Sequence, residues 1–166
     1  MPFFIGIPIN MRRKDREITN FSEIKNIIEN AKILHLGMSG KNIPYVLPLH
    51  YGFEIQDDKI FFYIHSAKTG KKMEILQENP NVYIAIESPW ELVPGSTPCT
   101  YGALYKSFQG LGIATFLKTS EAKIKGLKFL MKHQTDKEFH FDESMVSNVS
   151  VIQIEMTSIT AKGRLQ

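Results

Sequence analysis

The chain has 166 residues, and 20 Lys and Arg against 17 Asp and Glu leave a formal net charge of +3. With 43% hydrophobic residues it can form a core, because a chain of this length buries roughly 70% of its unfolded surface. This composition excludes disorder for most of the chain, and the small net charge without a recognised motif argues against nucleic-acid binding. The longest apolar runs are strand-sized, so no membrane span is predicted.

The division predicted along the chain is an N-terminal arm over residues 1–10 and one domain over residues 11–166. The apolar start has no basic residue ahead of it and contains two prolines, so it is not interpreted as a signal peptide. A single cysteine, Cys99, fits a reducing compartment and therefore a cytoplasmic location. As a small residue it is expected to be buried rather than to act as a nucleophile.

The first half of the chain reads as a helix followed by β-rich segments. Helical spacing of apolar residues after Asn20 predicts a helix, with Asn20 as its cap and Glu23 reaching back. Turn signals then separate three β-rich runs, at 33–38, 43–54 and 59–64, which predict an antiparallel meander. A short helix is predicted over 71–78, ended by Asn79 before Pro80.

The second half adds strands at 81–87, 100–108, 110–117 and 149–157, with a long proline-rich loop at 88–98. Ser120 is expected to cap a helix with one apolar face. Six or seven strands joined mostly by turns argue against a doubly wound parallel sheet. They predict a mainly β fold, an antiparallel barrel, closed or partly closed, with peripheral helices.

The segment 61–74 carries the strongest chemical signal. It runs from a strand through a loop containing Gly70 into a helix start, where Lys68, Lys71 and Lys72 gather. Cations at a helix start oppose the helix dipole, so a negative group is expected there. Free amides, the Ser66 hydroxyl and lysine ammonium groups together suit a phosphate. The alternative is a solvated lysine cluster whose side chains bend away, and this segment alone does not separate the two interpretations.

Other motifs are absent or incomplete. The P-loop pattern does not occur, and the run from Gly110 to Gly112 lacks the third glycine of a dinucleotide fingerprint. The histidines His35, His133 and His140 have no metal-ligand spacing, so no metal site is predicted.

Five sequence blocks, in order, resemble the flavin-binding split barrels of the pyridoxamine 5′-phosphate oxidase-like superfamily. Within it, they are most similar to the nitroimidazole-resistance (Nim-type) branch, which is linked to antibiotic resistance. The blocks are weak singly and specific together over about 150 residues. They are the residues 11–17, 44–52, 62–72, 105–114 and 154–163.

The resemblance implies a homodimer that holds FMN in two clefts between its chains. It places the flavin phosphate on Lys71 and Lys72, in agreement with the helix-start argument. It also implies that the part of the β-rich run 43–54 formed by Pro48, Leu49 and His50 lies beside the flavin ring and ribityl chain. The remaining implied cofactor contacts are His65, Ser66 and Ser107.

In the Nim-type branch a histidine at the position of His65 is linked with substrate reduction, so His65 is the implied catalytic residue. An unperturbed imidazole has a pKa near neutral pH, so His65 could donate a proton to a reduced nitro or carbonyl oxygen. The alternative is that His65 only packs on the flavin.

The sequence departs from the pyridoxamine-phosphate oxidases at positions that bear on which substrate is bound. Tyr45 and His50 stand where the pyridoxamine-phosphate oxidases have an arginine and a lysine, and the chain ends at Gln166 without their arginine-bearing segment. Oxidation of vitamin B6 is therefore not expected. Relatives tend to begin near Met11, so Met11 is a candidate translation start.

Three functions stay open. The first is an FMN-dependent reductase of small electron-poor molecules such as nitroimidazoles, supplied with electrons by a nicotinamide or another donor. The second is a flavin- or haem-binding split barrel without turnover, and the third is a scaffold that has lost its cofactor. The intact lysine-rich helix start favours the first over the third.

Overall fold

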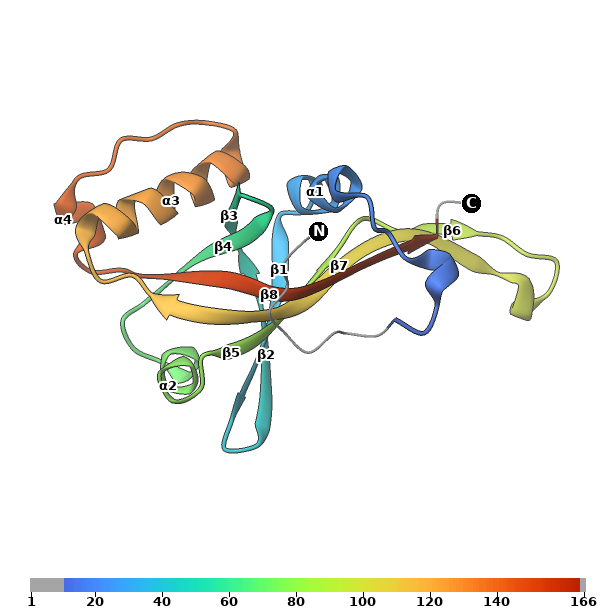
Figure 1. The fold of residues 1–166 in the computed structure, drawn as a ribbon, viewed down its shortest axis with the longest axis horizontal. Coiled ribbons are helices and arrows are strands. Elements are labelled where there is room, and N and C mark those ends of the chain that lie inside the picture. The colour runs from blue at the N-terminus through green and yellow to red at the C-terminus, as the bar shows by residue number, and fades with distance from the viewer. Residues whose placement is uncertain (1–10, 165–166) are drawn as a thin grey trace.

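The computed structural model describes residues 11–164, which form an antiparallel sheet flanked by helices (Figure 1). The predicted arm, residues 1–10, lies outside the described residues. The strands are β1 (Ile33–Gly40), β2 (Ile43–His50), β3 (Gly52–Gln56), β4 (Lys59–Ser66), β5 (Asn81–Glu87), β6 (Glu91–Val93), β7 (Gly102–Phe116) and β8 (Ser150–Arg164). The α-helices are α1 (Phe21–Asn30), α2 (Lys71–Glu78), α3 (Ser120–Thr135) and α4 (Glu143–Val146).

The strand order is β2-β1-β5-β7-β8-β4-β3, with β6 pairing only with β7. All of these pairs are antiparallel. The two end strands, β2 and β3, follow each other in the chain but do not pair with each other in the sheet. The predicted mainly β antiparallel fold is therefore confirmed as a split barrel that is not closed, and its described part has eight strands instead of six or seven.

The strands differ from the predictions in four places. The run 43–54 divides at Tyr51, which is fully buried between β2 and β3. The two strands predicted at 100–108 and 110–117 are one strand, β7, because Gly110 marks a close approach: a Cβ there would lie 2.1 Å from the Ser158 carbonyl oxygen of β8. The predicted long loop contains β6, and β8 extends well beyond residue 157.

The helix predictions are confirmed with small changes at the caps. Asn20 Oδ1 accepts from the backbone N of Ser22 at 2.9 Å and of Glu23 at 3.3 Å. The Glu23 carboxylate lies 4.0 Å from Lys106 Nζ, so the expected reach-back is replaced by an ion pair. For α3 the cap is Thr119 instead of Ser120, because its Oγ1 accepts from Ala122 N at 3.2 Å.

The main core lies between the inner face of the sheet and α1, where Ile27 and Ile28 are buried. On the other side of β3 and β4, α3 covers the sheet (Figure 1). Gly52 permits this close contact, since a Cβ there would lie 2.2 Å from the backbone N of Leu130. Cys99 is exposed, so the expectation that it is buried is wrong.

None of the helices within residues 11–164 combines the length and apolar character needed to cross a bilayer.

Candidate functional site

His50 and His65 come together through the register of β3 and β4. The last ladder pair is Gly52 opposite Tyr63, and two further residues along each strand lead to His50 and His65. The chain changes its pairing partner at this point, because β3 pairs with β4 whereas β2, just before it, pairs with β1. We call this place, with His50, His65 and the neighbouring Lys72 of α2, the β2–β4 split.

A polar network fixes β4 just before His65. Tyr63 Oη donates to Glu54 at 2.8 Å and accepts from Gln153 Nε2 at 2.9 Å. Lys125 of α3 lies 3.0 Å from the same Glu54 carboxylate. Burial, followed by the bond to Glu54, raises the pKa of Tyr63 to about 12. Tyr63 therefore remains a neutral donor, and β4 is held against β8 and α3 two residues before the site.

Positive charge at the split has no carboxylate to balance it. Partial burial lowers the pKa of His65, and the positive charges of Lys72 and His50 lower it further. Burial also lowers the pKa of Lys72. Within the described chain no carboxylate is among the groups that shift either value. An anion placed here would be stabilised by these cations and would in turn favour their charged forms.

The start of α2 adds unbonded backbone donors to this positive region. Gly70, at φ 123° and ψ 168°, occupies the cap position, and no side chain caps the helix. The backbone N of Met73 and of Glu74 bond back to Gly70 O at 2.9 and 3.2 Å. The first two helical amides, those of Lys71 and Lys72, have no carbonyl acceptor within the helix. An anion beside Lys72 could accept from them.

Lys71 faces a different part of the molecule from Lys72. It lines a hollow of about 130 Å³ between α2 and the β1–β2 turn, together with Gly40 and Tyr45. The structure thus brings Lys72 to the two histidines, whereas the Lys71 side chain lines this separate hollow and lies exposed. Of the two predicted phosphate ligands, Lys72 is the one electrostatically coupled to His65.

The other predicted residues of β2 and β4 lie near the split with different exposure. Pro48 is exposed and pairs with His35 on the outer face of the sheet. Leu49 is opposite Leu34 and packs on the core, so only its backbone could face a ligand. Ser66 is half-buried at the end of β4.

Ser107 lies far from His65 within one chain. Ile152 of β8 is opposite Ile64 on one side and Phe116 on the other, so Phe116 is the residue of β7 nearly level with His65. From Phe116 back to Ser107 the strand runs about 30 Å at the usual rise per residue. One small ligand cannot touch both side chains of the same chain.

Two hydroxyl groups near the middle of the sheet are buried without a hydrogen-bond partner among the described residues. They are Ser107 Oγ and Thr160 Oγ1. Ser107 is opposite Lys162, and Gln109 is opposite Thr160, so the two hydroxyls are diagonal neighbours on β7 and β8. An unpaired buried hydroxyl costs about 1–3 kcal/mol.

Gln134 of α3 is a site residue that the sequence did not indicate. Its Oε1 lies 3.1 Å from His50 Nδ1, across 84 residues of chain. A polar residue near the end of a helix carries no signal of such a contact. His133 beside it is buried, and its Nε2 lies 2.8 Å from Ala31 O, so it belongs to the packing of α3.

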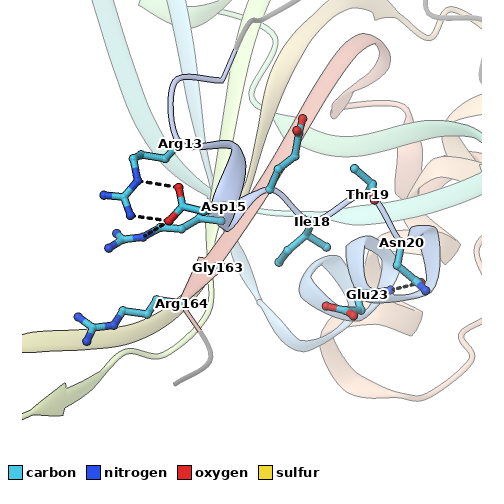
Figure 2. A pocket seen from close by; sticks show the side chains of 10 residues that line it. Arg13, Asp15, Ile18, Thr19, Asn20, Glu23, Gly163 and Arg164 are labelled. Atoms are coloured by element: carbon cyan, nitrogen blue, oxygen red, sulfur yellow. Dashed lines mark hydrogen bonds and ion pairs between the residues drawn. The ribbon is translucent and has the colours of Figure 1, made fainter.

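The largest hollow described, about 500 Å³, lies elsewhere, between the segment before α1 and the end of β8 (Figure 2). In Figure 2, Arg13 donates a hydrogen bond to Asp15 on one side of the hollow. Glu23 of α1 lies on the other side. The hydrogen bond to Arg13 lowers the pKa of Asp15 to about 2. The basic lining residues, Arg13, Arg16 and Arg164, equal in number the acidic ones, Asp15, Glu17 and Glu23, so this hollow carries no net charge. No cluster of three His, Cys, Asp or Glu side chains suited to a metal occurs in residues 11–164.

Comparisons with known proteins agree with this fold. The family model described as pyridoxamine 5′-phosphate oxidase matches residues 21–163. A crystal structure of a candidate 5-nitroimidazole antibiotic resistance protein from Bacteroides thetaiotaomicron is similar with a TM-score of 0.78 and 30% identity, over 89% of this chain and 86% of that one.

Two more distant structures share the fold. The flavocytochrome Anf3 from Azotobacter vinelandii has a TM-score of 0.76 and 16% identity, over 95% of this chain and 73% of that one. An FAD- and haem-binding protein from Mycobacterium smegmatis has a TM-score of 0.76 and 12% identity, over 89% and 73%. A search of the curated proteins found no match. The chain belongs to the pyridoxamine 5′-phosphate oxidase-like family of split barrels.

Proposed function

We propose that this protein is a homodimeric, cytoplasmic FMN-dependent reductase of small electron-poor molecules, nitroimidazoles and other nitroaromatics among them. The flavin phosphate is held at the start of α2 by the Lys72 ammonium and by the backbone amides of Lys71 and Lys72, and the ring lies along the end of β2. Ser66 and His65 lie at the edge of the cofactor. A nicotinamide or another donor supplies the electrons.

The observation that carries this proposal is the Lys72 ammonium, which lies beside His65 at a helix start that no side chain caps. A phosphate monoester is a compact anion whose oxygens accept from both ammonium and backbone N–H groups. The residues present therefore fit the anionic end of a flavin mononucleotide. The family membership and the resistance role named for the Bacteroides relative support the same conclusion.

A second copy of the chain completes the site. Ser107 cannot reach a ligand held by His65 of its own chain, so we assign it to the cofactor of the partner chain. The outer face of the sheet is suited to such contact, because Ile33, Val46 and Ile113 there are 45%, 59% and 44% exposed. Apolar side chains of this size on an uncovered sheet face are typical of an interface.

The role of His65 follows from its charge environment. In the ligand-free chain its lowered pKa keeps it neutral near pH 7. A phosphate beside Lys72 offsets the positive charge that lowers this pKa, so binding makes His65 a better proton carrier. Reduction of a nitro group to a nitroso group takes up two electrons and two protons and releases water. Reduced flavin would supply a hydride, which carries both electrons and one of the two protons, and His65 would deliver the second proton to the substrate oxygen that leaves as water.

Purification of the intact protein tests the proposal first by colour. We expect a yellow protein that releases FMN on denaturation, identified against FAD by chromatography. A colourless protein that takes up no added FMN overturns the proposal. A Soret band in place of the flavin spectrum supports the haem-binding alternative instead.

Turnover is tested with a panel of nitroaromatics, a reduced nicotinamide and product analysis. We expect reduction by the flavin-loaded dimer and loss of most turnover in His65→Ala with FMN still bound. Equal turnover in that variant shows that His65 only packs on the flavin. Flavin binding without reduction of any substrate supports a binding protein.

A further inference from the structure

Gln134 is held in one orientation by two backbone carbonyl groups. Its amide nitrogen donates to Lys32 O at 3.0 Å and to Tyr51 O at 2.8 Å. Carbonyl oxygens can only accept, so the amide nitrogen must face both of them and uses both of its hydrogens. The Gln134 carbonyl oxygen is then the atom that faces His50, at 3.1 Å from Nδ1. The usual ambiguity between the two ends of a glutamine amide is removed by these partners.

This orientation determines where His50 carries its proton. Gln134 Oε1 is an acceptor, so His50 Nδ1 must carry a hydrogen to make the bond. In a neutral imidazole only one nitrogen is protonated, and the hydrogen bond at one nitrogen sets the state of the other. His50 Nε2, on the opposite side of the ring from α3, is therefore left with a lone pair.

We infer that Gln134 holds His50 in the Nδ1–H tautomer and so makes Nε2 a hydrogen-bond acceptor for an N–H or O–H donor of the ligand bound at the β2–β4 split. Gln134 is a positioning residue, since it acts on the ligand through His50. The inference rests on the proposed function for the identity of that ligand. Its structural part, the tautomer, stands on the contacts of Gln134 alone.

The tautomer gives the split two chemically different ends. At the α2 end, Lys72 and the first helical amides donate hydrogen bonds and suit phosphate oxygens. At the β2 end, the lone pair of a neutral His50 repels an anionic oxygen and attracts a donor. A flavin carries donors away from its phosphate, the ring imide N–H and the ribityl hydroxyls. The arrangement therefore orients the ligand with its phosphate at α2 and a donor group beside His50.

The tautomer can be measured directly by ¹⁵N NMR of the histidine ring in the intact protein, at about pH 8.5, well above the ordinary histidine pKa. The His50 signals are assigned by their loss in His50→Ala. We expect a protonated, pyrrole-type Nδ1 and an unprotonated, pyridine-type Nε2 in the wild type before any ligand is added. The reverse assignment in a folded protein overturns the inference whether or not the protein binds flavin.

Two substitutions of Gln134 form a matched pair. Gln134→Glu and Gln134→Met both lose the hydrogen bonds donated to Lys32 and Tyr51, so any loosening of α3 is common to both. The glutamate keeps an acceptor for Nδ1–H, and the methionine side chain removes it. We expect the Nδ1–H signature to persist in Gln134→Glu and the Nε2–H form to increase several-fold in Gln134→Met. Equal signatures in the two variants contradict the role of Gln134.

Added FMN then tests the ligand contact separately. We expect the His50 Nε2 resonance to move toward the values of a hydrogen-bonded acceptor when FMN binds. Bound FMN with an unmoved Nε2 resonance overturns the acceptor role while leaving the proposed function intact. Absence of FMN binding overturns the proposed function, and the tautomer measured in the free protein then stands by itself.

Discussion

The starts of α1 and α2 satisfy their backbone amides in opposite ways. At α1, Asn20 accepts from two amides, and Glu23 adds a negative charge in the first turn. At α2, Gly70 has no side chain to accept, and although Glu74 is in the first turn, Lys71 and Lys72 come before it and add positive charge where the helix dipole is already positive. The first helix start is complete by itself, and the second needs an acceptor from outside its own residues.

This contrast separates a structural helix start from a binding one. A cap such as Asn20 stabilises the folded protein whether or not a ligand is bound. The start of α2 lacks that contribution, and under the proposed function its amides donate to a ligand instead. The loss of the Asn20 side chain should therefore affect folding alone, whereas the loss of the Lys72 side chain should affect binding.

The largest effect is expected for removal of both lysines of α2. In Lys71→Ala/Lys72→Ala the loss of the charge-assisted contact of Lys72 should weaken FMN binding by about 1.5–3 kcal/mol, and the loss of Lys71, which lines the separate hollow, should add less. Lys72 should account for the larger share, because it is the lysine coupled to His65. Fluorescence titration with FMN measures the affinity. The matched control is Lys118→Ala/Lys123→Ala at the start of α3, where affinity should stay unchanged.

Unchanged affinity in the Lys71/Lys72 variant would remove the phosphate site from the start of α2 and restore the interpretation as a solvated lysine cluster.

The next effect is expected at Gly70. Its φ of 123° is in a region that residues with a side chain rarely adopt, although a Cβ there would meet nothing within 4 Å. Gly70→Ala should therefore lower the free energy of unfolding by about 1–3 kcal/mol through backbone strain alone. Urea denaturation measures the change, with the exposed Thr69→Ala as a control within about 0.5 kcal/mol of the wild type. Equal stability of the two variants would mean that α2 begins with another backbone geometry.

A smaller effect is expected at the cap of α1. Asn20→Ala should cost about 1 kcal/mol of unfolding free energy, since two amides lose their acceptor. FMN affinity of the folded variant should match that of the wild type. Weaker binding by this variant would show that the two helix starts are not independent.

The sequence predicted the two helix starts well, because their signals are local. Both helices begin and end close to their predicted residues, because Asn20, Gly70 and the Asn79–Pro80 pair are local signals. Strand boundaries were predicted less well where they depend on a contact with a residue far away in the chain. Gly110 resembles a break in the sequence, but it permits the approach of β8, which only the sheet pairing shows.

The candidate site was predictable to a similar degree. The run from His65 to Lys72 was found because strand, loop and helix start are adjacent in the chain. The approach of His50 to His65 needed the register of β3 and β4, and the contact of His50 with Gln134 joins residues 84 apart. No periodicity or motif marks such a pair, so it stayed unpredicted until the fold was known.

The subtlest difference between the two lysines concerns the pKa of His65. Partial burial and the charge of Lys72 hold this pKa below the ordinary 6.5, and Lys71 is not among its causes. Lys72→Met should therefore raise the pKa of His65 in the flavin-free protein, and Lys71→Met should leave it unchanged. NMR titration of the His65 ring measures both, and added inorganic phosphate should raise the pKa in the wild type.

The pH dependence of the free energy of unfolding should also differ between the Lys72→Met and Lys71→Met variants. A pKa lowered by folding means that the unfolded chain binds the proton first as the pH falls. The contribution of His65 to stability is thus fully present above pH 6.5 and is lost as the pH falls through the lowered pKa. His133 has a lowered pKa as well, but it is common to all variants. Unfolding free energies should therefore fall less steeply with acid in Lys72→Met than in Lys71→Met, and identical slopes would show that Lys72 lies too far from His65 to act on it.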